Sequence, residues 1–163
     1  MDAATKEIDQ IMPNIIFLQK VANDQAQIIN HKYGNIYNIY YQRDDLKGFF
    51  TAITVSKKHQ LLERTIESFK TTSDAIRAKQ IVLINVDNTK FALINSTLEG
   101  GVNTFREREL QLKECVELIN HYQGRSYHVI FGGSLNIRND EADEIEDSTT
   151  FENMKHMQLK GSM

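Results

Sequence analysis

The chain has 163 residues, of which 40% are hydrophobic and 25% are charged, and its formal net charge is −3. A chain of this length and composition can bury a core as one domain, which excludes a disordered tail or a fibrous protein. Its 19 basic residues are outnumbered by 22 acidic ones. Proteins that grip a phosphate backbone usually carry a basic surplus, so nucleic acid is not the favoured partner, although a local basic patch is compatible with this balance.

The single cysteine, Cys115, cannot form an internal disulfide, which suits a reducing compartment. No apolar run approaches the roughly 20 residues that span a bilayer. Residues 1–10 are too polar and charged for a secretory signal. We therefore expect a protein of the cytoplasm or nucleus with no membrane segment.

The first half of the chain is predicted to contain both helices and strands. Helices are expected where apolar side chains recur on one helical face, and strands where apolar, β-branched and aromatic residues gather. These criteria place helices at residues 3–12 and 23–34 and strands at residues 15–18, 35–42, 49–55 and 61–69. Gly34 is expected to end the second helix in the left-handed conformation. The strand at 61–69 is expected to pair beside the strand at 49–55.

The second half opens with a predicted β-hairpin. Residues 80–86 and 90–97 are apolar runs joined by Asp-Asn-Thr at 87–89, and Asp and Asn tolerate the backbone conformations of a tight turn. Thr104 and Glu107 then have the spacing of a capping box, which predicts the start of a long helix with one apolar face.

The end of the chain is predicted to contain one more strand and one more helix. The strand covers residues 129–131, and the helix begins at Thr149 with Glu152 as its capping-box partner. Strands mixed with helices in this order predict an α/β or α+β layered domain. We place this domain at residues 1–147 and a C-terminal helix or tail at residues 148–163.

The stretch at 129–138, Val-Ile-Phe-Gly-Gly-Ser-Leu-Asn-Ile-Arg, is the most informative part of the chain. A short apolar run meets two glycines and then exposes Ser134, Asn136 and Arg138, as expected where a buried strand ends at a site. The stretch resembles the Gly-Asp-x-Asn signature strand of the endonuclease/exonuclease/phosphatase superfamily. The similarity is greatest to the branch that contains the tyrosyl-DNA phosphodiesterases, which free 5′-phosphotyrosyl ends and carry the form Phe-x-Gly-Asp-x-Asn-x-Arg.

The resemblance covers about residues 7–141 and does not rest on this stretch alone. It is densest in four blocks that follow one another in the order of the superfamily: residues 13–21, 48–53, 93–99 with 108–113, and 129–138. Four blocks in the correct order are a stronger signal than one. The resemblance implies the superfamily's sandwich of two sheets flanked by helices.

Enzymes of this superfamily cleave phosphodiesters with a magnesium ion and an aspartate that activates water. The resemblance places three changed residues at these functional positions. Lys20 stands where the superfamily has its metal-binding glutamate, Thr97 where it has a histidine, and Ser134 where it has the signature aspartate. An ammonium group repels Mg²⁺, and the two hydroxyls have neither the charge nor the basicity of the groups that they replace.

Three other residues match the superfamily pattern. They are Glu99, Asn136 and Arg138, and the resemblance implies that Asn136 and Arg138 contact phosphate. The superfamily's opening strand would precede Ala3, and its closing Ser-Asp-His motif would follow far beyond Asn136. We therefore expect a truncated form of the sandwich.

These substitutions predict a pseudoenzyme that has lost the ancestral magnesium ion and acts as a protein-interaction module. Strand edges left open by truncation predict a homodimer or a protein partner that supplies a strand. Two alternatives stay open. One is a residual metal-dependent phosphodiesterase that uses Glu99, Asn136, Asp140 or Glu141. The other is a phosphate- or nucleic-acid-binding module in which Lys20 substitutes for magnesium.

Overall fold

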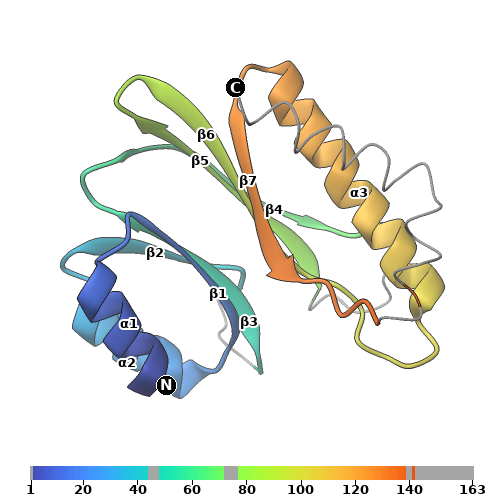
Figure 1. Cartoon of the computed structure of the whole chain (residues 1–163), viewed down its shortest axis with the longest axis horizontal. Helices are drawn as coiled ribbons and strands as arrows, with labels where there is room; N and C mark the ends of the chain where they lie inside the picture. Colours follow the sequence, from blue (N-terminus) through green and yellow to red (C-terminus); the bar gives the residue numbers. More distant parts are fainter. Residues whose placement is uncertain (1, 44–47, 72–76, 139–140, 142–163) are drawn as a thin grey trace.

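The computed structural model describes residues 2–43, 48–71, 77–138 and 141. Two β-sheets pack face to face, and helices cover their outer faces (Figure 1). The first sheet has the order β1-β3-β2, and the second has the order β4-β5-β6-β7. The strands are β1 (Ile15–Val21), β2 (Tyr37–Tyr41), β3 (Phe50–Ser56), β4 (Gln60–Ser68), β5 (Ala78–Val86), β6 (Thr89–Thr97) and β7 (His128–Ser134).

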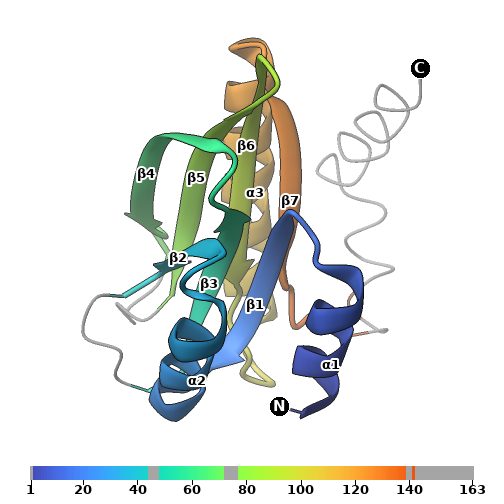
Figure 2. The same cartoon turned by 90° about the vertical axis from the view of Figure 1, so that its left-hand side faces the viewer.

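Three helices flank the sandwich: α1 (Asp2–Ile11), α2 (Asn23–Tyr33) and α3 (Phe105–Gly124). Helices α1 and α2 lie on the side of the first sheet and α3 on that of the second, as two views at right angles agree (Figures 1 and 2). The predicted two-sheet sandwich flanked by helices is therefore confirmed. No helix in the described part of the chain has both the length and the apolar character needed to cross a membrane.

The core lies in three layers, because each sheet packs on the other sheet and on its own helices. Between the sheets, fully buried aliphatic side chains of β3, β5 and β6 meet, and burial stabilises each by roughly 1.5–3 kcal/mol. Strand β5 shows why its sequence is a continuous apolar run. Ile81 and Leu83 face α3, whereas Val82 and Ile84 face the first sheet.

The predicted hairpin of β5 and β6 is confirmed. Val86 pairs with Thr89, and the two turn residues Asp87 and Asn88 have φ values of 48° and 66°. Both values lie in the left-handed region that a tight two-residue hairpin turn requires, and Asn and Asp reach this region more readily than other non-glycine residues.

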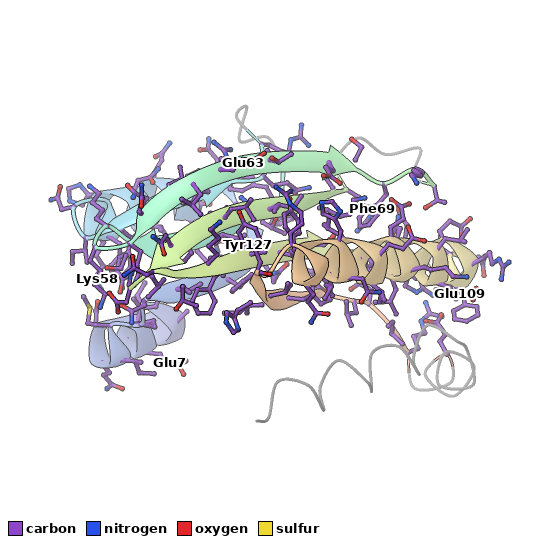
Figure 3. The ribbon with its side chains drawn as sticks, turned by 90° about the horizontal axis from the view of Figure 1, so that it is seen from above. Glu7, Lys58, Glu63, Phe69, Glu109 and Tyr127 are labelled. Atoms are coloured by element: carbon purple, nitrogen blue, oxygen red, sulfur yellow. The ribbon has the colours of Figure 1, made fainter. Side chains whose placement is uncertain are left out.

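The prediction that strand 61–69 pairs beside strand 49–55 is wrong. Both edges of β3 are occupied, by β1 on one side and β2 on the other, so β4 crosses to the second sheet and pairs with β5. Strand β4 forms an outer border of that sheet, where Figure 3 places the labelled Glu63. Most of its side chains are exposed.

Two predicted helix caps are also wrong. Gly34 is right-handed, with φ of −60°, and its amide continues the helix by donating to the carbonyl of Asn30. The glycine is needed for space, since a Cβ there would lie 2.4 Å from that oxygen. Thr104 does not cap α3, because its hydroxyl donates to the carbonyl of Gly101 and accepts from Arg108. The helix expected from Thr149 and the tail at 148–163 lie outside the described residues.

Candidate functional site

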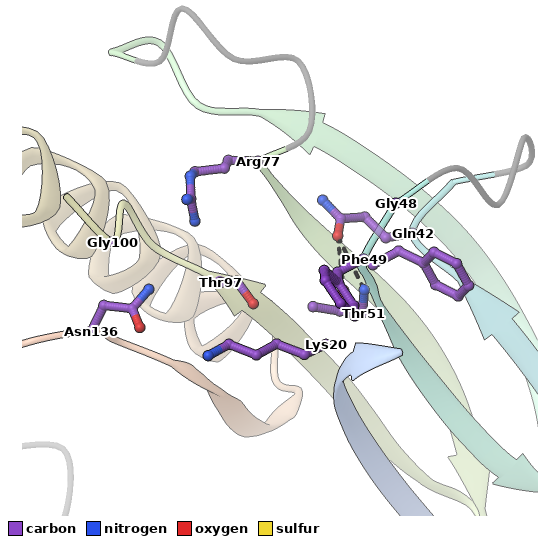
Figure 4. A pocket seen from close by; sticks show the side chains of 10 residues that line it. Lys20, Gln42, Gly48, Phe49, Thr51, Arg77, Thr97, Gly100 and Asn136 are labelled. Carbon is purple, nitrogen blue, oxygen red and sulfur yellow. Dashed lines mark hydrogen bonds between the residues drawn. The ribbon is translucent and has the colours of Figure 1, made fainter. Parts of the chain in front are cut away.

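A pocket of about 670 Å³ opens at the end of the sandwich where β1 and β6 end and β3 begins (Figure 4). It brings together segments that are far apart in the sequence. The lining residues are Lys20, Gln42, Gly48, Phe49, Phe50, Thr51, Arg77, Thr97, Gly100 and Asn136. Lys20, Thr97 and Asn136, which sequence reasoning singled out, therefore lie around one pocket.

Lys20 is positioned by a bulge in β1. Leu18 pairs with Ala52 and Val21 with Phe50, so two residues of β1 lie opposite one residue of β3. Lys20 itself has φ of 52°, a left-handed conformation that is uncommon for lysine and is often found at functional sites. The bulge turns its exposed side chain into the pocket, with the amine toward Thr97 and Asn136 (Figure 4).

Thr97 belongs to a polar network that joins the two sheets beneath the pocket. Its hydroxyl lies 3.0 Å from Oε1 of Gln19, to which it donates. The side-chain amide of Gln19 donates to Oδ1 of Asn95, a residue with no exposed surface. Asn95 in turn donates to the backbone carbonyl of Ala52 in β3 at 3.0 Å. Because its proton is committed to Gln19, the Thr97 hydroxyl offers the pocket mainly its acceptor lone pairs.

Ser134 and Asn136 are held against the end of β6. The Ser134 hydroxyl donates to Oδ1 of Asn136 at 3.1 Å, and Nδ2 of Asn136 donates to the carbonyl of Leu98 at 2.6 Å. Asn136 has φ of 52°, which asparagine tolerates better than most residues. Of the two, Asn136 reaches the pocket lining, and Ser134 lies behind it as its hydrogen-bond donor.

Arg77 provides a second cation at the pocket, directly before β5. Its Nε lies 2.8 Å from a carboxylate oxygen of Glu99, and its Nη1 donates to the carbonyl of Leu98 at 2.6 Å. Side-chain exposures of 22% and 20% place this ion pair at the pocket edge, partly shielded from solvent. The charge of Arg77 is thus balanced by Glu99, whereas no carboxylate in the described part of the chain forms an ion pair with Lys20.

A buried arginine fixes the loop that carries Glu99 and Gly100. The side chain of Arg108 has no exposed surface; its Nε and Nη2 both bind the carboxylate of Glu141, and its Nη1 donates to the carbonyls of Glu99 and Gly101. The hydrogen bonds from Arg108 lower the pKa of Glu141 below its usual value of 4.5. Arg108 therefore ties two segments together: Glu141, which follows Asn136 in the chain, and the loop after β6 that carries Glu99 and Gly101.

Arg138, expected beside Asn136 as a phosphate contact, points elsewhere. Its guanidinium donates to the carbonyl of Val102 at 3.4 Å, and its backbone amide donates to Glu141. It is not among the residues that line the pocket. Of the two residues expected to contact phosphate, Asn136 lines the pocket and Arg138 does not.

The described residues that line the pocket do not match the usual ligands of a magnesium ion. Hard divalent cations are held by carboxylate oxygens, but the lining contains an ammonium, a guanidinium, amides and hydroxyls. Within the described residues, no group of three or more His, Cys, Asp and Glu side chains is arranged to hold a metal. Among the described residues, the carboxylate of Glu99 at the pocket edge forms an ion pair with Arg77.

Sequence reasoning missed several residues of the pocket. Gln42 accepts a hydrogen bond at 3.1 Å from the hydroxyl of Thr51 across the β2–β3 pair (Figure 4). Phe49 lies at the pocket with 65% of its surface exposed, which is unusual for phenylalanine. Arg77 lies outside every helix and strand that the sequence predicts. The signal that could have found them is their position next to predicted strand ends, where sites form.

The fold of the chain is shared with a known class of proteins. A solved endonuclease/exonuclease/phosphatase from Bacteroides vulgatus superposes with a TM-score of 0.73, covering 93% of this chain and 60% of that one at 13% identity, which shows the shared fold. No family model matches the chain. The chain thus has the fold of the endonuclease/exonuclease/phosphatase superfamily, as the four sequence blocks predicted.

Within the superfamily, the chain is similar to tyrosyl-DNA phosphodiesterase 2. The 5′-tyrosyl-DNA phosphodiesterase of Caenorhabditis briggsae is 30% identical over 151 residues, or 90% of this chain and 42% of the relative. The structure of D. rerio TDP2 complexed with a single-strand DNA product superposes with a TM-score of 0.79 at 26% identity, covering 88% of this chain and 56% of that one. The chain thus spans less than half the length of the curated relatives that it matches.

Proposed function

We propose that the chain is a catalytically inactive phosphodiesterase-like protein, a pseudoenzyme that acts without magnesium as a protein-interaction module. One observation carries the loss of catalysis: the described lining of the family pocket offers no unpaired carboxylate or imidazole. The relatives are phosphodiesterases by name, and the fold is theirs.

The chemistry of hydrolysis explains why this lining matters. Attack of water on a phosphodiester needs a group that accepts a proton and a cation that offsets the charge that develops on the phosphate. A protonated lysine cannot accept a proton. The hydroxyls of Thr97 and Ser134 both donate to side-chain oxygens, and Glu99 is paired with Arg77. Loss of a single catalytic group typically costs orders of magnitude in rate.

The interaction role is supported by strand edges in the described part of the chain. Strands β1 and β7 each lie at one edge of a sheet, and β4 lies at the other edge of the second sheet. Strand β4 exposes about 40% of each of Leu61, Leu62 and Ile66. An exposed edge with apolar side chains pairs readily with another strand, so we propose self-association or a partner strand at β4. The buried thiol Cys115 is compatible with the reducing cytoplasm or nucleus.

A turnover assay tests the loss of catalysis. The purified chain is incubated with a 5′-phosphotyrosyl oligonucleotide and Mg²⁺ or Mn²⁺, with an active tyrosyl-DNA phosphodiesterase as the positive control. We expect no release of tyrosine above a chelated blank. Release that scales with protein and disappears in Asn136→Gly would overturn the proposal; glycine keeps the left-handed backbone at this position, so that variant removes only the amide.

The mass in solution tests the interaction role. Light scattering over a range of concentrations should show a dimer that Ile66→Lys on β4 dissociates, since a charge at an edge strand opposes pairing. The matched control is Ile28→Lys on the exposed side of α2, where 49% of the residue is exposed and no edge is involved. A monomer at all concentrations, with no change in either variant, would contradict self-association at β4.

A further inference from the structure

We infer that the pocket is a metal-independent binding site for a phosphate monoester, in which the Lys20 ammonium supplies the positive charge that the superfamily takes from magnesium. This inference rests on the proposed function, because both take Lys20 to stand where hydrolysis would need a magnesium ion. The described lining offers ammonium, guanidinium, amide and hydroxyl groups, which suit an anion better than a divalent cation.

The charge balance of the pocket favours an anion. Lys20 and Arg77 are the cations among the lining residues, and Arg77 lies 2.8 Å from its counter-ion Glu99. Counted over the described lining residues and Glu99, one positive charge stays unbalanced, and it lies on Lys20. The bulge directs this charge into the pocket although its backbone conformation is unfavourable for lysine, and outliers of this kind cluster at binding sites.

The hydrogen-bonding groups match the oxygens of a phosphate. A Cβ added at Gly100 would lie 3.6 Å from Nδ2 of Asn136 and 3.9 Å from Nη2 of Arg77, so the glycine leaves a space flanked by two N–H groups. Nδ2 of Asn136 uses one hydrogen for the Leu98 carbonyl and retains a second. Phosphate oxygens accept hydrogen bonds, and ammonium, guanidinium and amide groups donate them.

The size of the pocket admits more than the phosphate group itself. A volume of about 670 Å³ lies in the range of small-molecule sites, so an organic group esterified to the phosphate also fits. The exposed ring of Phe49 and the backbone of Gly48 form part of its wall. We therefore assign a phosphate monoester in preference to the free ion, with the phosphate beside Lys20 and the organic group toward Phe49.

Titration followed by amide NMR tests the inference directly. The probes are inorganic phosphate, a 5′-phosphorylated thymidine oligonucleotide and the same oligonucleotide with a 5′-hydroxyl, each in chelator at low salt. We expect both phosphate probes to shift the amides of Thr97, Gly100 and Asn136, the ester to bind more tightly, and the affinities to stay the same when Mg²⁺ replaces the chelator. Equal binding of the 5′-hydroxyl oligonucleotide would overturn the assignment.

Two variants test separately the positive charge of Lys20 and the space beside Gly100. Lys20→Gln should weaken phosphate binding roughly 10- to 100-fold, since it removes a charge-assisted hydrogen bond and leaves a neutral side chain of nearly the same length. Gly100→Ala should also weaken binding, because its methyl group enters the donor space with ordinary contact distances and leaves every charge in place. Lys58→Gln, at an exposed lysine of the β3–β4 turn outside the pocket, is the matched control and should bind as the wild type does.

A charge reversal decides between ammonium and metal. Lys20→Glu should lose phosphate binding in chelator and recover part of it in Mg²⁺. Binding of the wild type only in the presence of Mg²⁺, or wild-type affinity in Lys20→Gln, would overturn the inference. Failure here leaves the absence of turnover untouched, whereas release of tyrosine by the wild type would refute the proposed function without bearing on phosphate affinity.

Discussion

Asn95 joins the two sheets under the pocket, and its replacement by alanine offers a quantitative test of the fold. The residue has no exposed surface, and its Nδ2 lies 3.0 Å from the carbonyl of Ala52 and 3.4 Å from that of Leu18. Its Oδ1 accepts from Gln19. Asn95→Ala removes these hydrogen bonds and leaves buried groups unpaired, which should lower the free energy of unfolding by about 2–4 kcal/mol. In a domain of this size the melting temperature should fall by roughly 5–15 °C.

The matched control is Asn85→Ala on β5. Asn85 is half-buried, and its Oδ1 has no hydrogen-bond partner among the described residues. We expect a loss below about 1 kcal/mol, because no buried partner is abandoned there. Urea unfolding followed by circular dichroism measures both variants. If Asn95→Ala costs no more than Asn85→Ala, the polar connection between the sheets does not stabilise the fold as argued.

Three further predictions concern stability. Gly133→Ala should destabilise the chain far more than Gly132→Ala in thermal unfolding, since its Cβ would lie 2.3 Å from a backbone oxygen of β6, whereas the Cβ at Gly132 would meet a movable ring at 3.1 Å. Burial raises the pKa of the Cys115 thiol from 9.0 to about 12, so it should resist a thiol reagent until unfolded, and its contribution to stability should be lost as pH rises from 9 toward 12. Because the pKa of Glu141 is lowered in the folded chain, its ion pair with Arg108 contributes stability above pH 4.5, and this contribution is lost as the pH falls below that value. The double variant Arg108→Met with Glu141→Gln should therefore show a smaller decrease of the urea midpoint at acidic pH than the wild type. An equal decrease in both proteins would contradict the pairing.

The parts of the fold that depend on local pattern were predictable. The hairpin follows from turn residues that tolerate left-handed backbone. The strand predicted at 129–131 is present, but the prediction that it is buried is wrong: β7 runs from His128 to Ser134 at the edge of its sheet, and its residues are half-buried or exposed. The pairing of β4 was not predictable in this way. Strand propensity says nothing about which edge is vacant, and β3 was already paired on both sides.

Motif positions brought some residues of the candidate site together, but Arg138, which also lies at a motif position, does not line the pocket. Lys20, Thr97 and Asn136 come from three blocks that match the superfamily in order, and all three line one pocket. Arg77 sits between stretches without clear periodicity, and nothing in its neighbours indicates an ion pair with Glu99. Thr104 has the spacing of a capping box, but its hydroxyl instead accepts a hydrogen bond from the buried Arg108, one helical turn later.

The central claim is that an ammonium group occupies the place of a divalent ion. The most direct measurement is the paramagnetic broadening of amide signals when Mn²⁺ is added to the ¹⁵N-labelled chain without ligand. The amides of Thr97, Gly100 and Asn136 should broaden no more than exposed amides elsewhere, and they should broaden selectively in Lys20→Glu. Selective broadening of these amides in the wild type would show a bound ion at the pocket and contradict the claim.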